Sequence, residues 1–193
     1  DEVITAFGRT GAWTGSRLWD VKPDFMTTAK AITNGYYPFG AVMIAEQVVD
    51  TFESNEDSFG AVFHGYTYSA HPVGAAAALA ALAETKRLNV PVNAAARGLE
   101  LKVGCEALMA KYELVGDVRG QGLMVGIEMV SNRAAKTPAP RDSMGKLFEA
   151  IYEAGVMVRI SGNVIILSPP LIITAADVAR ILAAIDIGLA AIS

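Results

Sequence analysis

An alanine-rich stretch in the middle of the chain, "HPVGAAAALAALAETKRL" (residues 71–88), places the tightest limit on the fold. It reads as a helix, because Pro72 suits a first turn, where a missing N–H is no loss. The alanines cover every face of this helix instead of forming one stripe, so we expect it to be buried, with other backbone segments packed close to it. The chain has 193 residues, 52% of them apolar, which suits a globular protein with a core large enough to bury such a helix.

The composition also excludes several classes of protein. A net charge of −4 argues against a nucleic-acid binder, since nothing here would neutralise a row of phosphates. No apolar run is long enough to span a bilayer. The single Cys105 excludes an internal disulfide and fits a reducing, cytoplasmic compartment, with the thiol buried in a helix. The acidic start at Asp1 is not a signal peptide, and the missing initiator Met indicates a processed or incomplete chain.

The first 70 residues or so are irregular and rich in turns, with short regular elements between them. "DFMTTAKAI" predicts a strand that ends near Lys30, "AVMIA" a buried strand, and "EQVVDTF" a short helix. "RLNVP" breaks the helical pattern, so we place a boundary between two regions near residues 89–91.

The last hundred residues predict a smaller α+β domain. It begins with a helix from about Asn93 to Lys111, continues with a strand, tight turn and strand in "LVGDVRGQGLMVGIEMV", and has a loop in "NRAAKTPAPRD". "VMVRISGNVIILSPP" predicts a pair of strands, and Gly155 before it a left-handed helix cap. Two further helices carry apolar stripes at helical spacing, the second opened by a Thr174–Asp177 capping box. The stripes are Met144, Leu147, Phe148, Ile151 and Tyr152, and Val178, Ile181, Leu182, Ile185, Leu189 and Ile192.

Two residues of the first region suit covalent or acid–base chemistry. Lys30 lies among Ala29, Ala31 and Ile32, and an apolar pocket would lower its pKa and leave an amine that can attack a carbonyl. The alternative is a surface lysine whose stem lies on apolar neighbours. The carboxylate of Asp1, at the end of a strand, could hold a proton on a ring nitrogen; the alternative is an incidental chain end.

Two further stretches suit the binding of anions. In "HGYTYSAHP", hydroxyls such as those of Tyr66 and Thr67 precede a helix and could hold a phosphate, although an ordinary helix cap explains them as well. Arg159 lies in an otherwise apolar strand, where it either pairs with a carboxylate or points to solvent. We expect no metal site, because His64 and His71 are isolated from other ligand-type residues.

Taken together, these stretches resemble the class III pyridoxal-phosphate aminotransferases, especially the ω-amino acid and amine:pyruvate transaminases. "DEVITAFGRTG" is similar to the family's pyridine-binding motif, "TTAKAITNGYYPFGAVM" to its lysine segment, and "HGYTYSAHPVGAAAALA" to its phosphate-binding turn and helix. "VRGQGLMVGIEMV" and "VMVRISGNVIILSPPLIIT" resemble strands of its small domain. The resemblance implies an α/β fold of fold type I, with residues 1–90 ending the large-domain sheet and residues 91–193 forming the C-terminal α+β small domain.

The resemblance also implies a role for each candidate residue. Lys30 would form a Schiff base with pyridoxal 5'-phosphate and then shuttle the proton. Asp1 would keep the pyridine nitrogen protonated, and Val3 would pack on one face of the ring. Thr67, with the backbone near Tyr66, would bind the phosphate of the cofactor in the neighbouring subunit.

Arg159 would match a mobile arginine that binds a substrate carboxylate and swings away for an apolar amine. The implied reaction transfers an amino group from an amine or ω-amino acid to pyruvate or a similar keto acid. We expect a homodimer or higher oligomer with shared sites, and a chain that is the C-terminal portion of the enzyme, with the N-terminal half separate or missing. The alternatives are an inactive piece that keeps only dimerisation surface, or a class III aminomutase or decarboxylating relative.

The motif departs from the family's pattern at Ala6, where the family usually has Gly. If the backbone is kept, φ at Ala6 should be negative.

Overall fold

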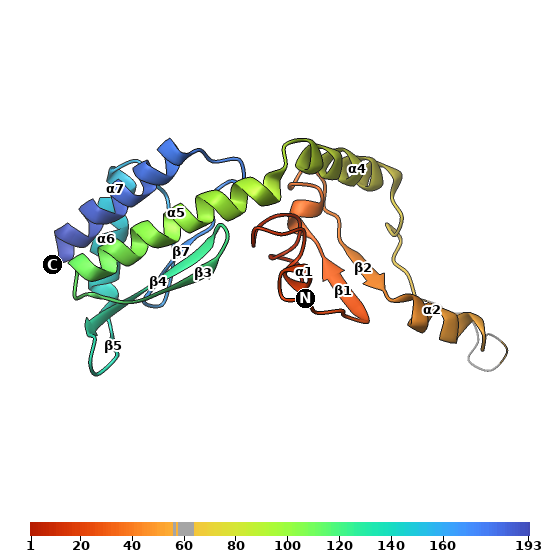
Figure 1. The fold of residues 1–193 in the computed structure, drawn as a ribbon, viewed down its shortest axis with the longest axis horizontal. Coiled ribbons are helices and arrows are strands. Elements are labelled where there is room, and N and C mark those ends of the chain that lie inside the picture. Colours follow the sequence, from red (N-terminus) through yellow and green to blue (C-terminus); the bar gives the residue numbers. More distant parts are fainter. Residues whose placement is uncertain (56, 58–63) are drawn as a thin grey trace. The chain divides into compact units, whose positions relative to one another are not determined.

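The computed structural model describes residues 1–55, 57 and 64–193, and the chain divides into two compact units, Asp1–Val90 and Pro91–Ser193 (Figure 1). The division falls where the helical pattern breaks in the sequence, and Asn89 there has a φ of 50°. The assignment of the two units to a large and a small domain stays a prediction.

The first unit holds two short strands and several helices. They are α1 (Gly15–Leu18), β1 (Phe25–Thr28), a 3-10 helix (Lys30–Ile32), β2 (Ala41–Ile44), α2 (Glu46–Glu53) and α4 (Pro72–Arg87). β1 and β2 form an antiparallel two-stranded sheet in which Phe25 lies opposite Ile44 and Thr28 opposite Ala41. The predicted strands and short helix are therefore present, and the lysine begins the 3-10 helix, separated from β1 by Ala29 alone.

The burial expected for two of these elements is wrong. In α4 only one face is buried, at Gly74, Ala78, Ala81 and Thr85, while Leu79 on another face is 71% exposed. The predicted buried strand β2 carries exposed apolar side chains at Val42, Met43 and Ile44. The reason is the same in both cases: these faces have an interior composition, but within the described residues nothing packs over them.

The turn at the start of the chain keeps the backbone that the Ala6 departure required. The positive φ angles fall on the next two residues, Phe7 at 63° and Gly8 at 112°, and not on Ala6. Ala6 is 2% exposed. The small side chain at this position therefore fits the turn without left-handed strain.

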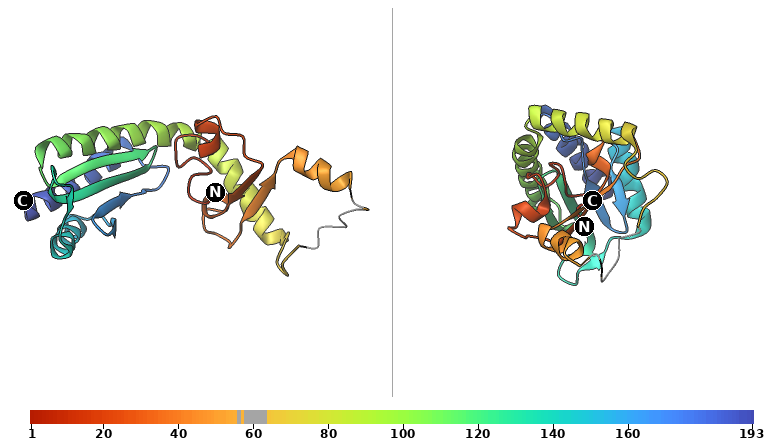
Figure 2. Two further views of the ribbon diagram at one scale, coloured as in Figure 1. Left: turned by 90° about the horizontal axis from the view of Figure 1, so that it is seen from below. Right: turned by 90° about the vertical axis from the view of Figure 1, so that its right-hand side faces the viewer.

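The second unit is a sheet covered by three helices (Figure 2). Its elements are α5 (Val90–Lys111, whose first residue belongs to the first unit), β3 (Val115–Gln121), β4 (Met124–Asn132), β5 (Thr137–Pro138), α6 (Arg141–Glu153), β6 (Arg159–Ser161), β7 (Val164–Leu167) and α7 (Ala175–Ile192). The strands are antiparallel in the order β3-β4-β7-β6, and β5 pairs with β4. β5 lies in a stretch that we expected to be a loop.

The core of this unit lies between the sheet and the helices. Along β4, buried Val125, Ile127 and Met129 alternate with half-buried residues, as expected for a sheet with one covered face. Leu147 and Ile151 of α6 and the Val178, Ile185 and Leu189 positions of α7 pack into the same cluster.

The local signals in this unit are confirmed. Thr174 and Asp177 form the capping box, and Gly155 has a φ of 86° after α6. Two positions of the first stripe are less covered, since Phe148 is half-buried and Tyr152 is 59% exposed. Cys105 is fully buried in α5. α5 begins at Val90, a few residues before the expected start. Among the described helices, none is long and apolar enough to cross a membrane.

Candidate active site

The first turn of the chain is built around a buried carboxylate, that of Glu2. It accepts hydrogen bonds from the backbone N–H groups of Gly15 at 2.9 Å and Ser16 at 2.6 Å. It also accepts from the hydroxyls of Ser16, at 2.5 Å, and Thr5. These donors bring the start of the chain against the N-terminus of α1, more than ten residues further along.

The charge of Glu2 is stabilised by this arrangement. Burial by itself would raise the pKa of the Glu2 carboxyl, but the hydrogen bonds from Ser16, Thr5 and Gly15 outweigh it and lower the pKa to about 2. Glu2 is 5% exposed and remains ionised over the physiological range. A carboxylate that keeps its charge at such low exposure holds its donors firmly in place.

The backbone of Glu2 joins this turn to the strand that precedes the candidate lysine. Its N–H donates to the carbonyl of Thr27 in β1 at 2.8 Å, three residues before Lys30. Asp1 is exposed, and its Oδ1 accepts from the N–H of Val3 at 2.8 Å. The structure therefore brings Asp1 and Val3 beside the segment that carries Lys30.

Lys30 has an unusual backbone and an exposed side chain. Its φ is 46°, in the left-handed region that residues with a Cβ rarely adopt, and such strain is concentrated at functional sites. Among the described residues, no apolar pocket of the kind expected from Ala29, Ala31 and Ile32 encloses the lysine: Ile32 is buried, but Lys30 itself faces solvent. The residues on either side of it, Ala29 and Ala31, are half-buried.

The turn before α4 presents backbone and hydroxyl groups at the surface. Ser69 Oγ accepts from the N–H of Tyr66 at 2.9 Å, and the Ser69 N–H donates to the Tyr66 carbonyl at 2.9 Å. Tyr66 is 76% exposed, and Thr67 is also exposed. The His71 side chain caps α4 by accepting from Val73 N–H.

The same end of α4 contacts the loop that follows Lys30. The rings of Tyr37 and His71 stack with centroids 5.3 Å apart. A Cβ added at Gly74 would lie 2.5 Å from the Phe39 ring, so the absence of a side chain there lets the loop approach. The three stretches with predicted cofactor residues thus lie in one unit and are connected by direct contacts.

Arg159 lies in the other unit, at the start of the edge strand β6, and is exposed. It lines an apolar groove of about 470 Å³ together with Met157, Ile166 and Pro169. An arginine over an apolar groove can offer its charge to a carboxylate or swing toward solvent.

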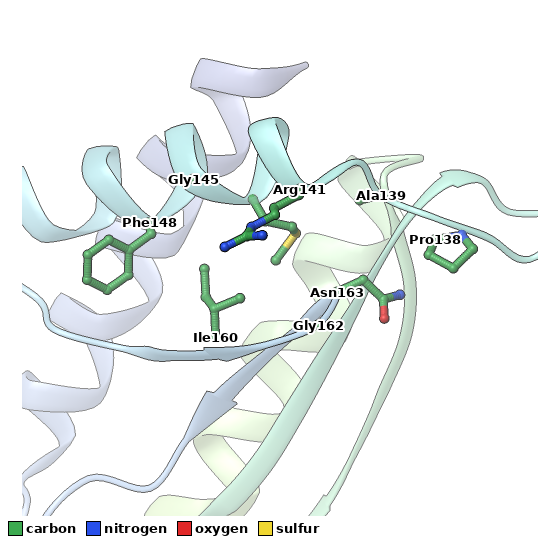
Figure 3. Close-up of a pocket in the computed structure, with 9 residues that line it drawn as sticks. Pro138, Ala139, Arg141, Gly145, Phe148, Ile160, Gly162 and Asn163 are labelled. Atoms are coloured by element: carbon green, nitrogen blue, oxygen red, sulfur yellow. The ribbon is translucent and has the colours of Figure 1, made fainter.

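A larger hollow of about 750 Å³ lies between α6 and the β6–β7 strands, and Figure 3 shows the Arg141 side chain extending over it toward Ile160. None of the predicted site residues lines this hollow. Among the described residues, no group of His, Cys, Asp or Glu has the arrangement of a metal site.

Sequence reasoning missed Glu2 as a part of this site. Three of the four donors to its carboxylate lie thirteen or fourteen residues away, at Gly15 and Ser16, and the fourth, Thr5, is three residues away. A possible signal was Thr14-Gly15-Ser16, a helix start that leaves backbone N–H groups for a carboxylate.

Comparison with known proteins identifies the family. A family model described as aminotransferase class-III matches residues 1–188. The chain belongs to the class-III aminotransferases. Gamma-aminobutyrate transaminase 1, mitochondrial, from Oryza sativa subsp. indica is 38% identical over 180 residues, which are 92% of this chain and 35% of that relative. An uncharacterised aminotransferase of Sinorhizobium fredii is 39% identical over 187 residues, 95% of this chain and 40% of the relative.

Solved structures give the fold of this class-III aminotransferase chain. An amine transaminase from an uncultivated Pseudomonas species, in its pyridoxal-phosphate-bound internal aldimine form, matches with a TM-score of 0.95 and 39% identity. It covers 100% of this chain and 44% of its own. The (S)-enantioselective omega-transaminase of Thermomicrobium roseum matches with a TM-score of 0.91 and 36% identity, over 100% and 42% of the two chains. The α/β fold of fold type I is confirmed, over well under half of the relatives' length.

Proposed function

We propose that this chain carries the catalytic lysine of a pyridoxal-phosphate-dependent transaminase, which moves an amino group from an amine or ω-amino acid to pyruvate or a similar keto acid. The observation that carries the proposal is the Glu2–Thr27 hydrogen bond, which joins the Asp1 turn to the Lys30 strand within the region that the family model matches. The solved amine transaminase that this chain resembles was studied with that cofactor bound.

The residues of the first unit fit such a cofactor. It supplies an electron sink when its pyridine nitrogen is protonated, and Asp1 Oδ1 or Oδ2 would hold that proton. Val3, half-buried beside Asp1, would pack on a ring face. Lys30 Nζ would hold the cofactor as a Schiff base and then move the proton of the substrate. The exposed Thr67 hydroxyl and the backbone near Tyr66 would bind the phosphate of the cofactor in the neighbouring subunit.

The exposure of Lys30 bears on how the site is completed. A lysine must be shielded from water to act as a neutral amine, because a desolvated ammonium loses its proton more readily. In this chain its side chain faces solvent. We infer that residues outside this chain, from a further segment and from a second subunit of a homodimer, form the walls of the pocket. The cytoplasmic location stays a prediction, and the name of the rice relative contains the word mitochondrial.

Absorbance spectroscopy tests the role of Lys30. Pyridoxal phosphate is added to the 193-residue chain and, in parallel, to a longer polypeptide that includes this chain. The visible absorbance band of the lysine adduct is recorded for both. Lys30→Ala should abolish the band, whereas Lys22→Ala, another exposed lysine of the same unit, should keep it. A band that survives Lys30→Ala would remove Lys30 from the proposed role. If the wild type shows no band in either sample, the alternative of an inactive piece that keeps only dimerisation surface is favoured.

Half-reactions test the substrate class and Arg159. A 1-arylethylamine, which lacks a carboxylate, should convert the cofactor in the longer polypeptide as an amino acid does. Arg159→Ala should weaken the carboxylate substrate far more than the amine, since only the former uses the guanidinium. Arg141→Ala, an exposed arginine over the other hollow, serves as the matched control. Reaction with α-amino acids alone would exclude the ω-transaminase branch, and equal losses for both substrates would remove the role of Arg159.

A further inference from the structure

We propose that Glu2 is a positioning residue that fixes Asp1 and Val3 in relation to the strand leading to Lys30. The inference rests on the proposed function as far as the cofactor is concerned. Its geometric part, that one buried carboxylate sets the course of the first turn, concerns this chain alone. Neither the family match nor the names of the relatives assign a role to this residue.

The contacts of Glu2 run in two directions from a single residue. Its side chain is held by donors at Gly15 and Ser16, at the start of α1. Its backbone N–H is bonded to Thr27 in β1, and its carbonyl accepts from Ala6 at 3.0 Å. Glu2 therefore ties together the chain start, α1 and the lysine strand, and the flanking Asp1 and Val3 have little freedom to move independently.

A purely structural role as a cap for α1 explains less. α1 is only four residues long and already has its own cap, since Thr14 Oγ1 accepts from Arg17 N–H at 3.1 Å. Glu2 brings a full negative charge to a position 5% exposed, where an uncharged side chain would be easier to bury. Four donors compensate the charge, and they fix the carboxylate in direction as well as in place.

The amide of Gln has nearly the same volume as the carboxylate but only one acceptor oxygen. In Glu2→Gln, the amide NH2 group would face a donor among Gly15 N–H, Ser16 N–H and the two hydroxyls, so at least one bond must break. Thr14→Ala is the matched control. It weakens the same short helix by removing its cap and leaves the Glu2 carboxylate untouched.

The first measurement needs no cofactor. Amide hydrogen exchange by NMR is compared in the wild-type chain, Glu2→Gln and Thr14→Ala. We expect Glu2→Gln to speed exchange at the amides of Val3 and Ala6, and Thr14→Ala to speed it at Arg17 while sparing these two. Unchanged protection of Val3 and Ala6 in Glu2→Gln would overturn the inference, whether or not the chain binds a cofactor.

The second measurement uses the longer polypeptide with pyridoxal phosphate. We expect Glu2→Gln to weaken cofactor binding on the order of tenfold and to shift the visible band. Thr14→Ala should bind the cofactor with an affinity and spectrum close to those of the wild type, even where it lowers the thermal stability as much as Glu2→Gln does. Wild-type affinity and spectrum in Glu2→Gln would overturn the cofactor part. If the wild type itself forms no lysine-dependent band, the proposed function fails, and the exchange measurement still decides whether Glu2 positions the turn.

Discussion

Replacing Gly98 in α5 by alanine tests the packing of the second unit most sharply. A Cβ at this position would lie 2.2 Å from the carbonyl carbon and oxygen of Gly122, in the turn between β3 and β4. Ordinary van der Waals contact begins near 3.4 Å, so helix and turn must separate by about 1.2 Å. The atoms met are backbone atoms of Gly122, whose φ is 56°, so no side chain can rotate away to relieve the contact.

The magnitude follows from two opposing effects. Alanine in place of glycine inside a helix gains about 1 kcal/mol of helix propensity. Overpacking of a tight contact costs about 1–3 kcal/mol, and a backbone clash belongs at the upper end. We expect Gly98→Ala to lower the free energy of unfolding by about 2 kcal/mol, which corresponds to a Tm lower by about 10 °C for a unit of this size.

Gly145 in α6 provides the control, because nothing lies within 4 Å of a Cβ added there. Gly145→Ala should therefore show the propensity gain alone, up to about 1 kcal/mol of added stability. Urea unfolding followed by far-UV circular dichroism measures both variants, since α5, α6 and α7 supply most of the helical signal. Fluorescence of Trp13 and Trp19, both in the first unit, reports separately on that unit. Equal stability of the two variants would refute the close approach of α5 to the turn.

The remaining predictions concern three single residues. Burial, and to a lesser extent Glu106, raises the pKa of the Cys105 thiol to about 12, so a thiol reagent at neutral pH should label it only after unfolding; rapid labelling of the folded chain would contradict this. Arg133 Nη2 donates to three backbone carbonyls around the end of α5, those of Met109, Tyr112 and Val115, each at 2.8 Å, so Arg133→Ala should lower the free energy of unfolding in urea by about 2 kcal/mol, and Arg133→Lys should recover only part of it. The pKa of the Glu2 carboxyl is lowered from 4.5 to about 2, so its ionised form should stabilise the first unit fully above pH 4.5, and this contribution should fade as the pH falls toward 2. Tryptophan fluorescence during acid titration should therefore show a weaker pH dependence in Glu2→Gln than in the wild type.

Elements with a strong local signal could be predicted from the sequence. The stripe of α7 and its Thr174–Asp177 box, and the Gly155 cap of α6, depend on contacts within a few residues, so spacing alone reveals them. The family was reached from the order of several motifs and is confirmed by the match over residues 1–188.

Features that depend on distant partners could not be read from the sequence. The burial of α4 and β2 depends on which segments pack against them. Their apolar composition predicts that some segment packs there but not which one. Lys30 has apolar neighbours in sequence, yet its exposure is decided by the fold around it. Three of the four donors to the Glu2 carboxylate come from Gly15 and Ser16, thirteen and fourteen residues away, a separation at which no periodic pattern operates.

The small sheet of β1 and β2 has a consequence for the behaviour of the chain in solution. Across the described residues each of these strands pairs only with the other, and Phe25, Val42 and Ile44 are each about half exposed. Open strand edges with apolar side chains are templates for pairing with another chain. Lys22 and Pro23 are residue types that hinder such pairing, but they precede β1 and leave its own edge open. The 193-residue chain on its own should therefore self-associate, with light scattering that grows steeply with concentration, until another polypeptide covers this sheet.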